Sequence, residues 1–208
     1  MSKLKLWGQP KSINVQKVLW ALDELGLSYE RIDAGGPFGR VKEADYLSLN
    51  PNGLVPTLEV DGVPLWESNA ILRYLFGAHG AAPTHPSDPI VRARADQWTE
   101  WYASTYWPNT RVLLVQLVRT PEAQRDSKVI EAARTQVLHA AKLLEAQLER
   151  HPFVAGDHFT WGDIPLGAAA HRFLNLPFDR PALKATEAWY ARLRSRAPYK
   201  KWIDLPLT

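Results

Sequence analysis

One stretch, residues 50–68 (NPNGLVPTLEVDGVPLWES), constrains the fold more than any other part of the chain. Its centre is Asp61-Gly62, a pair typical of a two-residue hairpin turn, with runs of strand-forming residues on both sides. Pro56 stands just before the first run, where a residue without an N–H group can precede a strand but cannot continue a ladder. The stretch therefore predicts a corner, an antiparallel hairpin over 57–66 and then a new element.

The corner at Pro56 also predicts a place for a ligand. A cis peptide bond after Val55 is expected there, with the Val55 backbone N–H and C=O left unpaired at a strand edge, free to hold an extended peptide. Glu67 and Ser68 follow the hairpin at the predicted start of a helix, where free N–H groups and the helix dipole favour an anion. A simpler interpretation is also open, in which Ser68 caps the helix and Glu67 lies in its first turn.

Length and composition narrow the class of protein. The 208 residues suffice for one large domain or two small ones, each with its own core. Hydrophobic residues make up 46% and charged residues 23%, as in soluble globular proteins, and no apolar run approaches the ~18 residues of a membrane span. The net charge of +3 is scattered rather than gathered in a basic block, so no nucleic-acid partner is expected. The beginning, MSKLKLW, lacks a signal-peptide core, which predicts a cytoplasmic protein.

The chain contains no cysteine. Disulfide bonds, cysteine nucleophiles and thiolate metal sites are therefore excluded, and any thiol chemistry must come with a ligand. The six histidines stand alone, with no pair at metal-ligand spacing, so no metal site is predicted.

The first eighty residues predict a βαβ unit followed by a helix, the hairpin and a closing helix. Apolar positions alternate in the predicted strands and recur every three to four residues in the predicted helices. The glycine-rich segment 34–39 is expected to be flexible. This order is typical of a thioredoxin-like domain, with the first two strands parallel. The expected elements are strand 4–7, helix 15–25, strand 28–32, helix 41–49, the hairpin 57–66 and helix 67–79.

A break in periodicity, rich in glycine and proline, predicts a linker over 81–87 between an N-terminal domain, 1–80, and a C-terminal domain, 88–208. Beyond it the pattern is helical throughout. Thr160 and Asp163 have the spacing of a capping box and are interpreted as structural. Apolar stripes predict helices from 91 to Pro108, over 130–148 and, as the last helix, over 182–196, with a further helix starting at Thr160.

Val55-Pro56, followed eleven residues later by Glu67-Ser68, resembles the glutathione-binding motif of cytosolic glutathione S-transferases of the theta-like or bacterial type. A thioredoxin-like α/β domain followed by an all-helical domain is also that family's architecture, so the resemblance covers essentially the whole chain. It implies that Val55 and Pro56 contact the cysteinyl part of glutathione. It also implies that Glu67 and Ser68 hold the γ-glutamyl end.

The resemblance implies that the group that activates the thiol lies between the first strand and the first helix. The serine of theta-like members falls on Ser12, and the asparagine used by some bacterial-type members falls on Asn14. Both remain candidates, and both also fit a structural role at a helix start. Trp7 occupies the place of a strand-end tyrosine, so catalysis by a tyrosine is not expected.

Further glutathione contacts are implied in the same way. Family members often carry a histidine or lysine nine residues before the Asn-Pro pair, and here that position is Val41, which departs from the pattern. Arg40 or Lys42 is expected to meet the glycyl carboxylate instead. Asp96 matches an aspartate that reaches the ligand ammonium across a dimer interface, which implies a homodimer.

An aromatic-rich segment of the C-terminal domain is expected to line a pocket for an apolar electrophile, together with the loop after the first strand. Several of these rings suit the core of a helical domain equally well. The expected lining residues are Trp7, Trp101, Tyr102, Thr105 and Tyr106.

These features predict a cytoplasmic, homodimeric glutathione S-transferase with a role in detoxification. Glutathione is the expected co-substrate, and its thiolate is expected to attack a small apolar electrophile. Two other functions remain open, a glutathione-dependent disulfide reductase, which needs no protein cysteine, and a non-catalytic transferase-like binding module.

Overall fold

The computed structural model describes residues 2–207. They divide into two compact units, Met1–Gly80 (unit 1) and Ala81–Thr208 (unit 2). Unit 1 contains a sheet and helices, whereas unit 2 up to residue 207 contains helices and one isolated β-bridge, between Phe153 and Gly156. Within residues 2–207, no helix combines the length and the apolar character needed to cross a membrane.

Unit 1 is built on a four-stranded sheet of order β2-β1-β3-β4. β1 pairs in parallel with β2, and β3 runs antiparallel to both β1 and β4. This is the thioredoxin-like arrangement predicted from the sequence. The elements are β1 (Leu4–Trp7), α1 (Ile13–Glu24), β2 (Glu30–Ile32), a 3₁₀ turn (Gly36–Phe38), α2 (Ala44–Leu49), β3 (Thr57–Val60), β4 (Val63–Trp66) and α3 (Ser68–His79).

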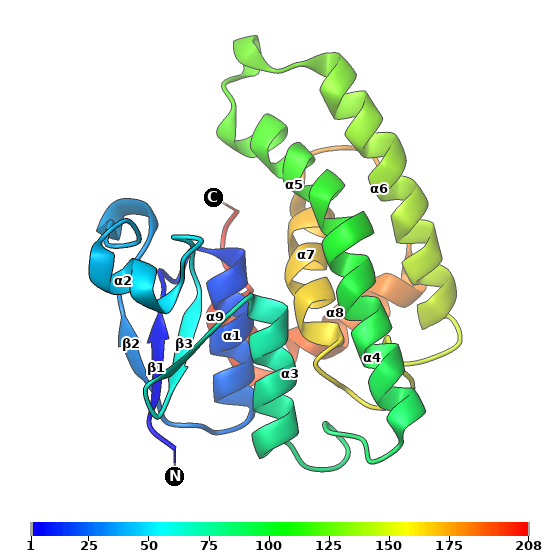
Figure 1. The fold of residues 1–208 in the computed structure, drawn as a ribbon. Coiled ribbons are helices and arrows are strands. Elements are labelled where there is room, and N and C mark those ends of the chain that lie inside the picture. The colour runs from blue at the N-terminus through cyan, green and yellow to red at the C-terminus, as the bar shows by residue number, and fades with distance from the viewer. Residues whose placement is uncertain (1, 208) are drawn as a thin grey trace. The chain divides into compact units, whose positions relative to one another are not determined.

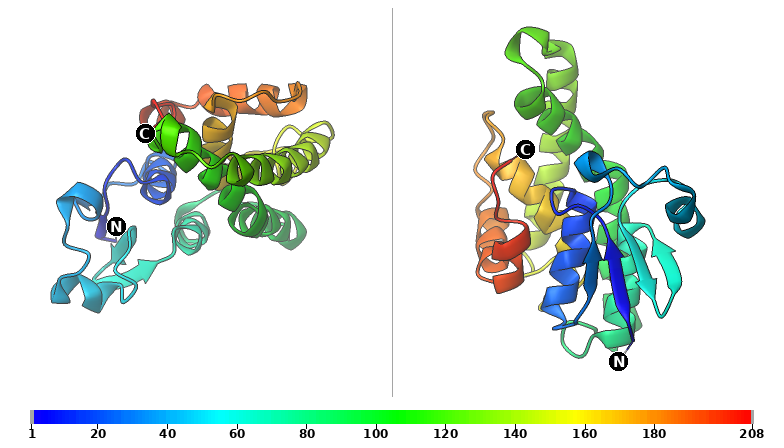
Figure 2. Two further views of the ribbon diagram at one scale, coloured as in Figure 1. Left: turned by 90° about the horizontal axis from the view of Figure 1, so that it is seen from above. Right: turned by 90° about the vertical axis from the view of Figure 1, so that its left-hand side faces the viewer.

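The helices of unit 1 cover both faces of its sheet. α1 and α3 pack against each other on one face, and α2 lies on the other (Figures 1 and 2). The apolar stripe of α1 is buried because Val15, Val18 and Leu22 recur at helical spacing and face the core. Gly26, with a φ of 64°, follows the helix in the left-handed conformation that a helix end commonly needs.

The β3–β4 hairpin sets the register of the sheet. Asp61 and Gly62 both have positive φ, 51° and 85°, as a two-residue turn matched to the twist of the strands requires. Thr57 pairs with Trp66 across the hairpin, and Trp7 of β1 pairs with Thr57 on the other side. The turn and this paired row therefore lie at opposite ends of the hairpin.

Unit 2 is a set of helices around a core rich in large side chains, among them Trp189, Phe173 and Leu144. α5 packs against α6, and α4 and α5 pack against α7 (Figure 1). The elements are α4 (Pro89–Trp101), a π-helical segment (Tyr102–Tyr106), α5 (Trp107–Leu114), a second π-helical segment (Val115–Arg119), a 3₁₀ turn (Glu122–Gln124), α6 (Ser127–Leu148), α7 (Asp163–Asn175), α8 (Lys184–Arg194) and α9 (Ala197–Trp202).

Two expectations for unit 2 are wrong. The helix that begins with α4 does not end at Pro108, which lies in the first turn of α5 directly after the π-helical segment. In a regular α-helix, a proline cannot donate to the carbonyl four residues earlier, and its ring clashes with that carbonyl. The wider π-helical turn before Pro108 changes this pairing, so the helix can continue past the proline. The helix expected over 182–196 is α8, which ends at Arg194, and it is not the last helix, because α9 follows it with Pro198 in its first turn.

Unit 1 differs from the expectation at element ends and in the segment 34–39. The second strand is shorter than 28–32, and α2 begins three residues after position 41. The glycine-rich segment 34–39 contains the 3₁₀ turn Gly36–Phe38. Short elements at the sheet edge are determined by packing rather than by local preference, so their ends are the least predictable part of the unit.

Candidate functional site

The candidate site lies just beyond the row formed by Trp7, Thr57 and Trp66. β1 ends at this row, β3 begins there and β4 ends there. The loop 8–12, the residues before β3 and the start of α3 therefore lie at one end of the sheet, although they are far apart in the sequence. The register of β1, β3 and β4 thus brings together three of the segments in which candidate residues were predicted.

The Val55–Pro56 pair, called the corner below, has a cis peptide bond, as expected from the sequence. Pairing in β3 begins only at Thr57. The backbone N–H and C=O of Val55 make no hydrogen bond within residues 2–207. The corner therefore presents a donor and an acceptor from one residue, an arrangement that suits an extended peptide segment.

Glu67 and Ser68 form the start of α3, where Glu67 is the N-cap residue. The Glu67 side chain is exposed and makes no cap hydrogen bond, and its backbone has a φ of 69°, a costly conformation for a residue other than glycine. Ser68 is the first helical residue, with 5% of its surface exposed. The simpler interpretation, in which Ser68 caps the helix, is wrong. The first N–H groups of α3 lack intrahelical partners and remain available to an anion.

Ser12 and Asn14 lie at the start of α1. Ser12 is the N-cap residue, but its hydroxyl makes no cap hydrogen bond, and Asn14 is the second residue of the helix. Both side chains are half-buried, and neither makes a hydrogen bond within residues 2–207. The geometry thus leaves two polar groups available beside the N-terminus of α1 and does not rank them.

Trp7 belongs to the core of unit 1 rather than to an open surface. Its indole N–H donates to Glu59 at 2.6 Å, and its ring meets the ring of Tyr46 edge-on at 5.7 Å. The guanidinium of Arg40 lies 4.9 Å from the centre of the Trp7 ring, a cation–π distance. Arg40 also contacts Asp45 at 3.4 Å and has a positive φ of 67°. The Trp7 ring therefore helps to hold the Arg40 guanidinium in place.

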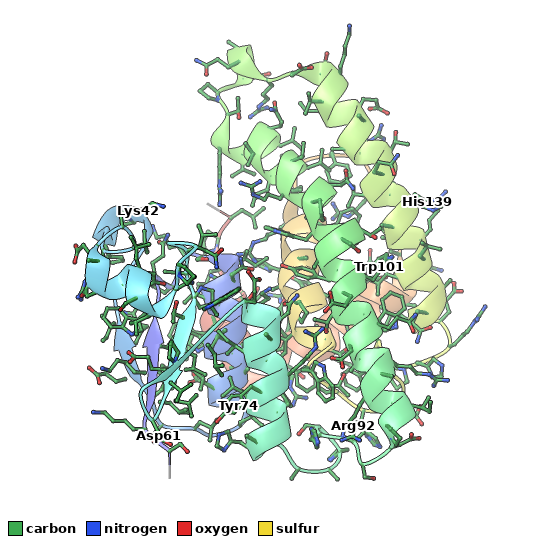
Figure 3. The ribbon with its side chains drawn as sticks, viewed as in Figure 1. Lys42, Asp61, Tyr74, Arg92, Trp101 and His139 are labelled. Atoms are coloured by element: carbon green, nitrogen blue, oxygen red, sulfur yellow. The ribbon has the colours of Figure 1, made fainter. Side chains whose placement is uncertain are left out.

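The loop that carries Arg40 and Lys42 lies against the corner. A Cβ atom on Gly35 would lie 3.1 Å from the side chain of Val55, and one on Gly53 would lie 2.9 Å from the Nζ atom of Lys42. Lys42 is thus beside the turn that leads into the corner, at the end of unit 1 away from Asp61 (Figure 3). Unit 1 brings both candidate cations to the end of the sheet that carries the corner.

The candidate residues of unit 2 have structural contacts of their own. Asp96 accepts a hydrogen bond from the indole N–H of Trp161 at 2.9 Å. Trp101, which is labelled in Figure 3, lines a cavity of about 310 Å³ whose other lining residues are Gln97, Trp98, Leu143, Ala146, Gln147 and Arg150. The roles predicted for Asp96 and Trp101 remain predictions.

Tyr102, Thr105 and Tyr106 lie in the π-helical segment. Both tyrosine rings are buried, and burial raises the pKa of each phenol far above its usual value, so both stay protonated. The ring of Tyr106 packs edge-on against Phe173 at 6.0 Å, whereas Thr105 is half-buried. Irregular helical segments of this kind often occur at functional sites. Membership of these residues in an electrophile pocket stays a prediction.

Three residues near the corner were missed in the sequence. Tyr46, Asn50 and Thr57 form a hydrogen-bonded network with the backbone of Leu54. The sequence contained only a weak indication of this network, because Asn50 is typical of a turn and Tyr46 fits an apolar position on a short helix. Among residues 2–207, no cluster of three or more histidine, aspartate or glutamate side chains is placed to hold a metal ion.

Comparison with known proteins identifies the class to which this fold and site belong. The family model described as "Glutathione S-transferase, N-terminal domain" matches residues 2–76, and "Glutathione S-transferase, C-terminal domain" matches residues 127–199. Glutathione S-transferase GstB of Escherichia coli K12 is 38% identical over 207 residues, which is 99% of this chain and 100% of that protein. The chain belongs to the glutathione S-transferase family, a family of transferases.

Solved structures agree with this assignment. A theta class glutathione S-transferase from Xanthomonas axonopodis pv. citri, with glutathione bound, is 42% identical and superposes with a TM-score of 0.93 over 100% of both chains. Glutathione transferase F2 from Populus trichocarpa is 28% identical, with a TM-score of 0.86 over 97% of each chain. The predicted family and fold class are confirmed, and the relatives support the transferase prediction rather than the reductase or the binding module.

Proposed function

We propose that this protein binds glutathione in unit 1 and transfers its thiolate to a small apolar electrophile. One observation carries the proposal: the Trp7, Thr57 and Trp66 row places three kinds of unsatisfied polar group at one sheet end. These are the Val55 backbone, the free N-terminus of α3 with Glu67 and Ser68, and the side chains at the start of α1. Together they match the polar groups of a γ-glutamyl tripeptide with a thiol.

Each part of glutathione has a partner in this proposal. The Glu67 carboxylate accepts the α-ammonium of the γ-glutamyl residue, while Ser68 and the free N–H groups of α3 donate to its α-carboxylate. Val55, beside Pro56, pairs through its N–H and C=O with the cysteinyl residue. Arg40 or Lys42 meets the glycyl carboxylate, and Lys42 is supported by its position beside the turn before the corner.

The thiolate is stabilised by Ser12, with Asn14 as the second candidate. A thiol has a pKa of about 8.5, so its ionisation near pH 6.5 requires a shift of about 2 units, or ~2.7 kcal/mol. One hydrogen bond to a charged group contributes about 1.5–3 kcal/mol, and the N-terminus of α1 adds about 0.3–1 kcal/mol. Because the Ser12 hydroxyl is not used as a cap, it is free to supply this bond.

A cytoplasmic homodimer with a role in detoxification completes the proposal. In support, unit 1 exposes large apolar side chains near the hairpin, with exposed fractions of 65% for Leu54, 62% for Val63 and 42% for Trp66. A second subunit that covers them would remove this surface from water. Asp96 is proposed to reach the ligand ammonium of the neighbouring subunit. Light scattering that shows a monomer at micromolar concentration would remove the dimer and this role for Asp96.

The decisive experiment measures glutathione binding and transfer together. The wild type is expected to be retained on immobilised glutathione, to melt at a higher temperature in millimolar glutathione, and to conjugate glutathione to an aryl halide. A model disulfide tested in parallel should be reduced far more slowly. A protein that is neither retained nor stabilised would refute the proposal, and disulfide reduction without conjugation would reassign the activity. The residues of the electrophile pocket, Trp7, Trp101, Tyr102, Thr105 and Tyr106, remain proposals that substrate comparison would test.

A further inference from the structure

The hydroxyl of Tyr46 lies in a closed network of hydrogen bonds behind the corner. It donates to the backbone C=O of Leu54 at 2.6 Å and lies 2.9 Å from the hydroxyl of Thr57. The side-chain amide of Asn50 donates to the same two groups, at 2.8 Å to Leu54 and 3.1 Å to Thr57. When Thr57 donates to the Tyr46 oxygen, every proton of the network has an acceptor. The Leu54 carbonyl then accepts two hydrogen bonds.

The Leu54 carbonyl is important because it shares a peptide group with the Val55 N–H. This peptide bond is trans, so the carbonyl and the N–H point in opposite directions within one plane. Two donors that hold the carbonyl therefore also hold the direction of the N–H, which makes no hydrogen bond within residues 2–207. Hydrogen bonds at the carbonyl polarise the amide and make its N–H a better donor.

We propose that Tyr46 is a positioning residue that acts through the Leu54 carbonyl to aim the Val55 N–H at a peptide carbonyl of the bound ligand. The inference rests on the proposed function, in which that carbonyl belongs to the cysteinyl residue of glutathione. It goes beyond the proposed site because Tyr46 itself touches no ligand.

The surroundings of Tyr46 suit this role. Its side chain is fully buried, and its ring packs with Trp7 and Val55 in one apolar cluster of unit 1. Burial raises the pKa of the Tyr46 phenol above its usual value, so the hydroxyl keeps the proton that it donates. Because α2 carries Tyr46 and the packed cluster holds its ring, the hydroxyl has little freedom to turn away from Leu54.

The first test is Tyr46→Phe, which keeps the ring and removes the hydroxyl. The KM for glutathione should rise about 3- to 10-fold, as expected for one neutral hydrogen bond, with kcat at saturating glutathione nearly unchanged. Tyr29→Phe is the matched control, since its hydroxyl also makes a hydrogen bond in unit 1, to Asp23. That control should leave the KM for glutathione unchanged, and an unchanged KM in Tyr46→Phe itself would overturn the proposal.

A second ligand separates positioning from general damage to the site. γ-Glutamylcysteamine keeps the γ-glutamyl group and the thiol but lacks the cysteinyl carbonyl that Val55 is proposed to bind. Its affinity, measured by calorimetry, should be the same for wild type and Tyr46→Phe, although it is weaker than that of glutathione for both. Equal weakening of both ligands in the variant would mean that Tyr46 merely supports the packing, and would overturn its positioning role.

The Val55 amide resonance provides a measurement that does not depend on glutathione. In the protein without ligand, Tyr46→Phe should move the amide proton and nitrogen shifts of Val55, whereas Tyr29→Phe should leave them in place. An unmoved resonance overturns the positioning role even if the wild type binds glutathione. A wild type that fails to bind glutathione overturns the proposed function instead, so the two failures are distinguishable.

Discussion

Among the acidic residues at helix starts, Asp163 and Glu67 have opposite surroundings. Asp163, in unit 2, is fully buried and accepts hydrogen bonds from the backbone of Val154 and Thr160 and from the indole of Trp189, at 2.9 to 3.1 Å. Glu67, in unit 1, is exposed, makes no cap hydrogen bond and has a positive φ. The first arrangement stabilises a fold, and the second leaves a helix terminus open for a ligand.

The hydrogen bonds around Thr160 support the structural interpretation of Asp163, although α7 begins at Asp163 and not at Thr160 as predicted. The Asp163 carboxylate accepts from the Thr160 N–H at 2.9 Å, and the Thr160 hydroxyl accepts from the Gly162 N–H at 3.3 Å. Both partners lie within three residues, so the motif is visible in the sequence. At Glu67, by contrast, the side chain makes no cap hydrogen bond to the first N–H groups of α3 within residues 2–207.

The largest expected effect is the loss of the buried acid. Asp163→Ala leaves three buried N–H donors without an acceptor and should lower the free energy of unfolding by about 4 kcal/mol. Urea unfolding measures this loss, and Asp157→Ala, an exposed aspartate in the same loop, is the matched control. A loss no larger than that of the control would mean that this network does not stabilise unit 2.

The pH dependence of stability tests the burial of Asp163, which distinguishes it from the exposed Glu67. Burial raises the pKa of Asp163 from 3.8 to about 6, while its hydrogen bonds act in the opposite direction. The folded state therefore holds this proton longer than the unfolded state does. The resulting stabilisation is complete below pH 3.8 and is lost as pH rises through about 6, a change of roughly 3 kcal/mol.

This change is read from the difference between wild type and Asp163→Asn, because the variant does not titrate at this position. The difference in free energy of unfolding should fall as pH rises from 4 to 7. A constant difference over that range would contradict the raised pKa.

The next effect concerns turnover rather than stability. Ser12→Ala should raise the pKa of bound glutathione by about 1–2 units and lower turnover near pH 6.5 by about 10- to 100-fold, with glutathione affinity little changed. Thiolate absorbance of the binary complex against pH measures the pKa. Asn14→Ala is the matched comparison and should do less. A shift only in Asn14→Ala would reverse the assignment, and no shift in either would leave activation to the backbone N–H groups of α1.

The smallest expected effects are at Glu67, where function and stability should separate. Glu67→Ala and Glu67→Gly should each weaken glutathione binding about 10-fold, because the ligand ammonium loses its partner at an exposed site. Glycine accepts the positive φ at no steric cost, so Glu67→Gly should also raise the free energy of unfolding by about 1 kcal/mol. Calorimetry and urea unfolding measure the two quantities. Unchanged glutathione affinity in both variants would mean that the site is misplaced.

Local sequence predicted much of the fold because the signals were local. The hairpin was read from Asp61-Gly62, and the end of α1 from Gly26, since both positions need the left-handed conformation that the structure shows. The prediction that a helix ends at Pro108 was wrong because the decisive feature is not visible in the local sequence. A proline ends a regular helix, but the π-helical segment before it changes the backbone geometry, and no residue near Pro108 announces that change.

In the candidate site, too, local sequence identified individual residues, whereas their arrangement depends on tertiary structure. Ser12, Val55, Glu67 and Ser68 could be named from the sequence because each follows or precedes a strand or helix whose own pattern is clear. Their convergence depends on register, since only the pairing of Trp7 with Thr57 and Trp66 places three separate segments at one sheet end. The sequence also contained no sign that Ser68 would not cap α3.

By itself, the sequence determined the two-unit α/β and helical plan, the proline corner, the lack of any protein thiol and the residues from which a glutathione site could be built. These follow from backbone preferences and side-chain chemistry, which act over a few residues. Tertiary structure alone decided which polar groups remain without partners and that the Tyr46 hydroxyl reaches the Leu54 carbonyl. Those outcomes depend on contacts between segments distant in the chain or separated by a turn, whose geometry is set only when the core packs.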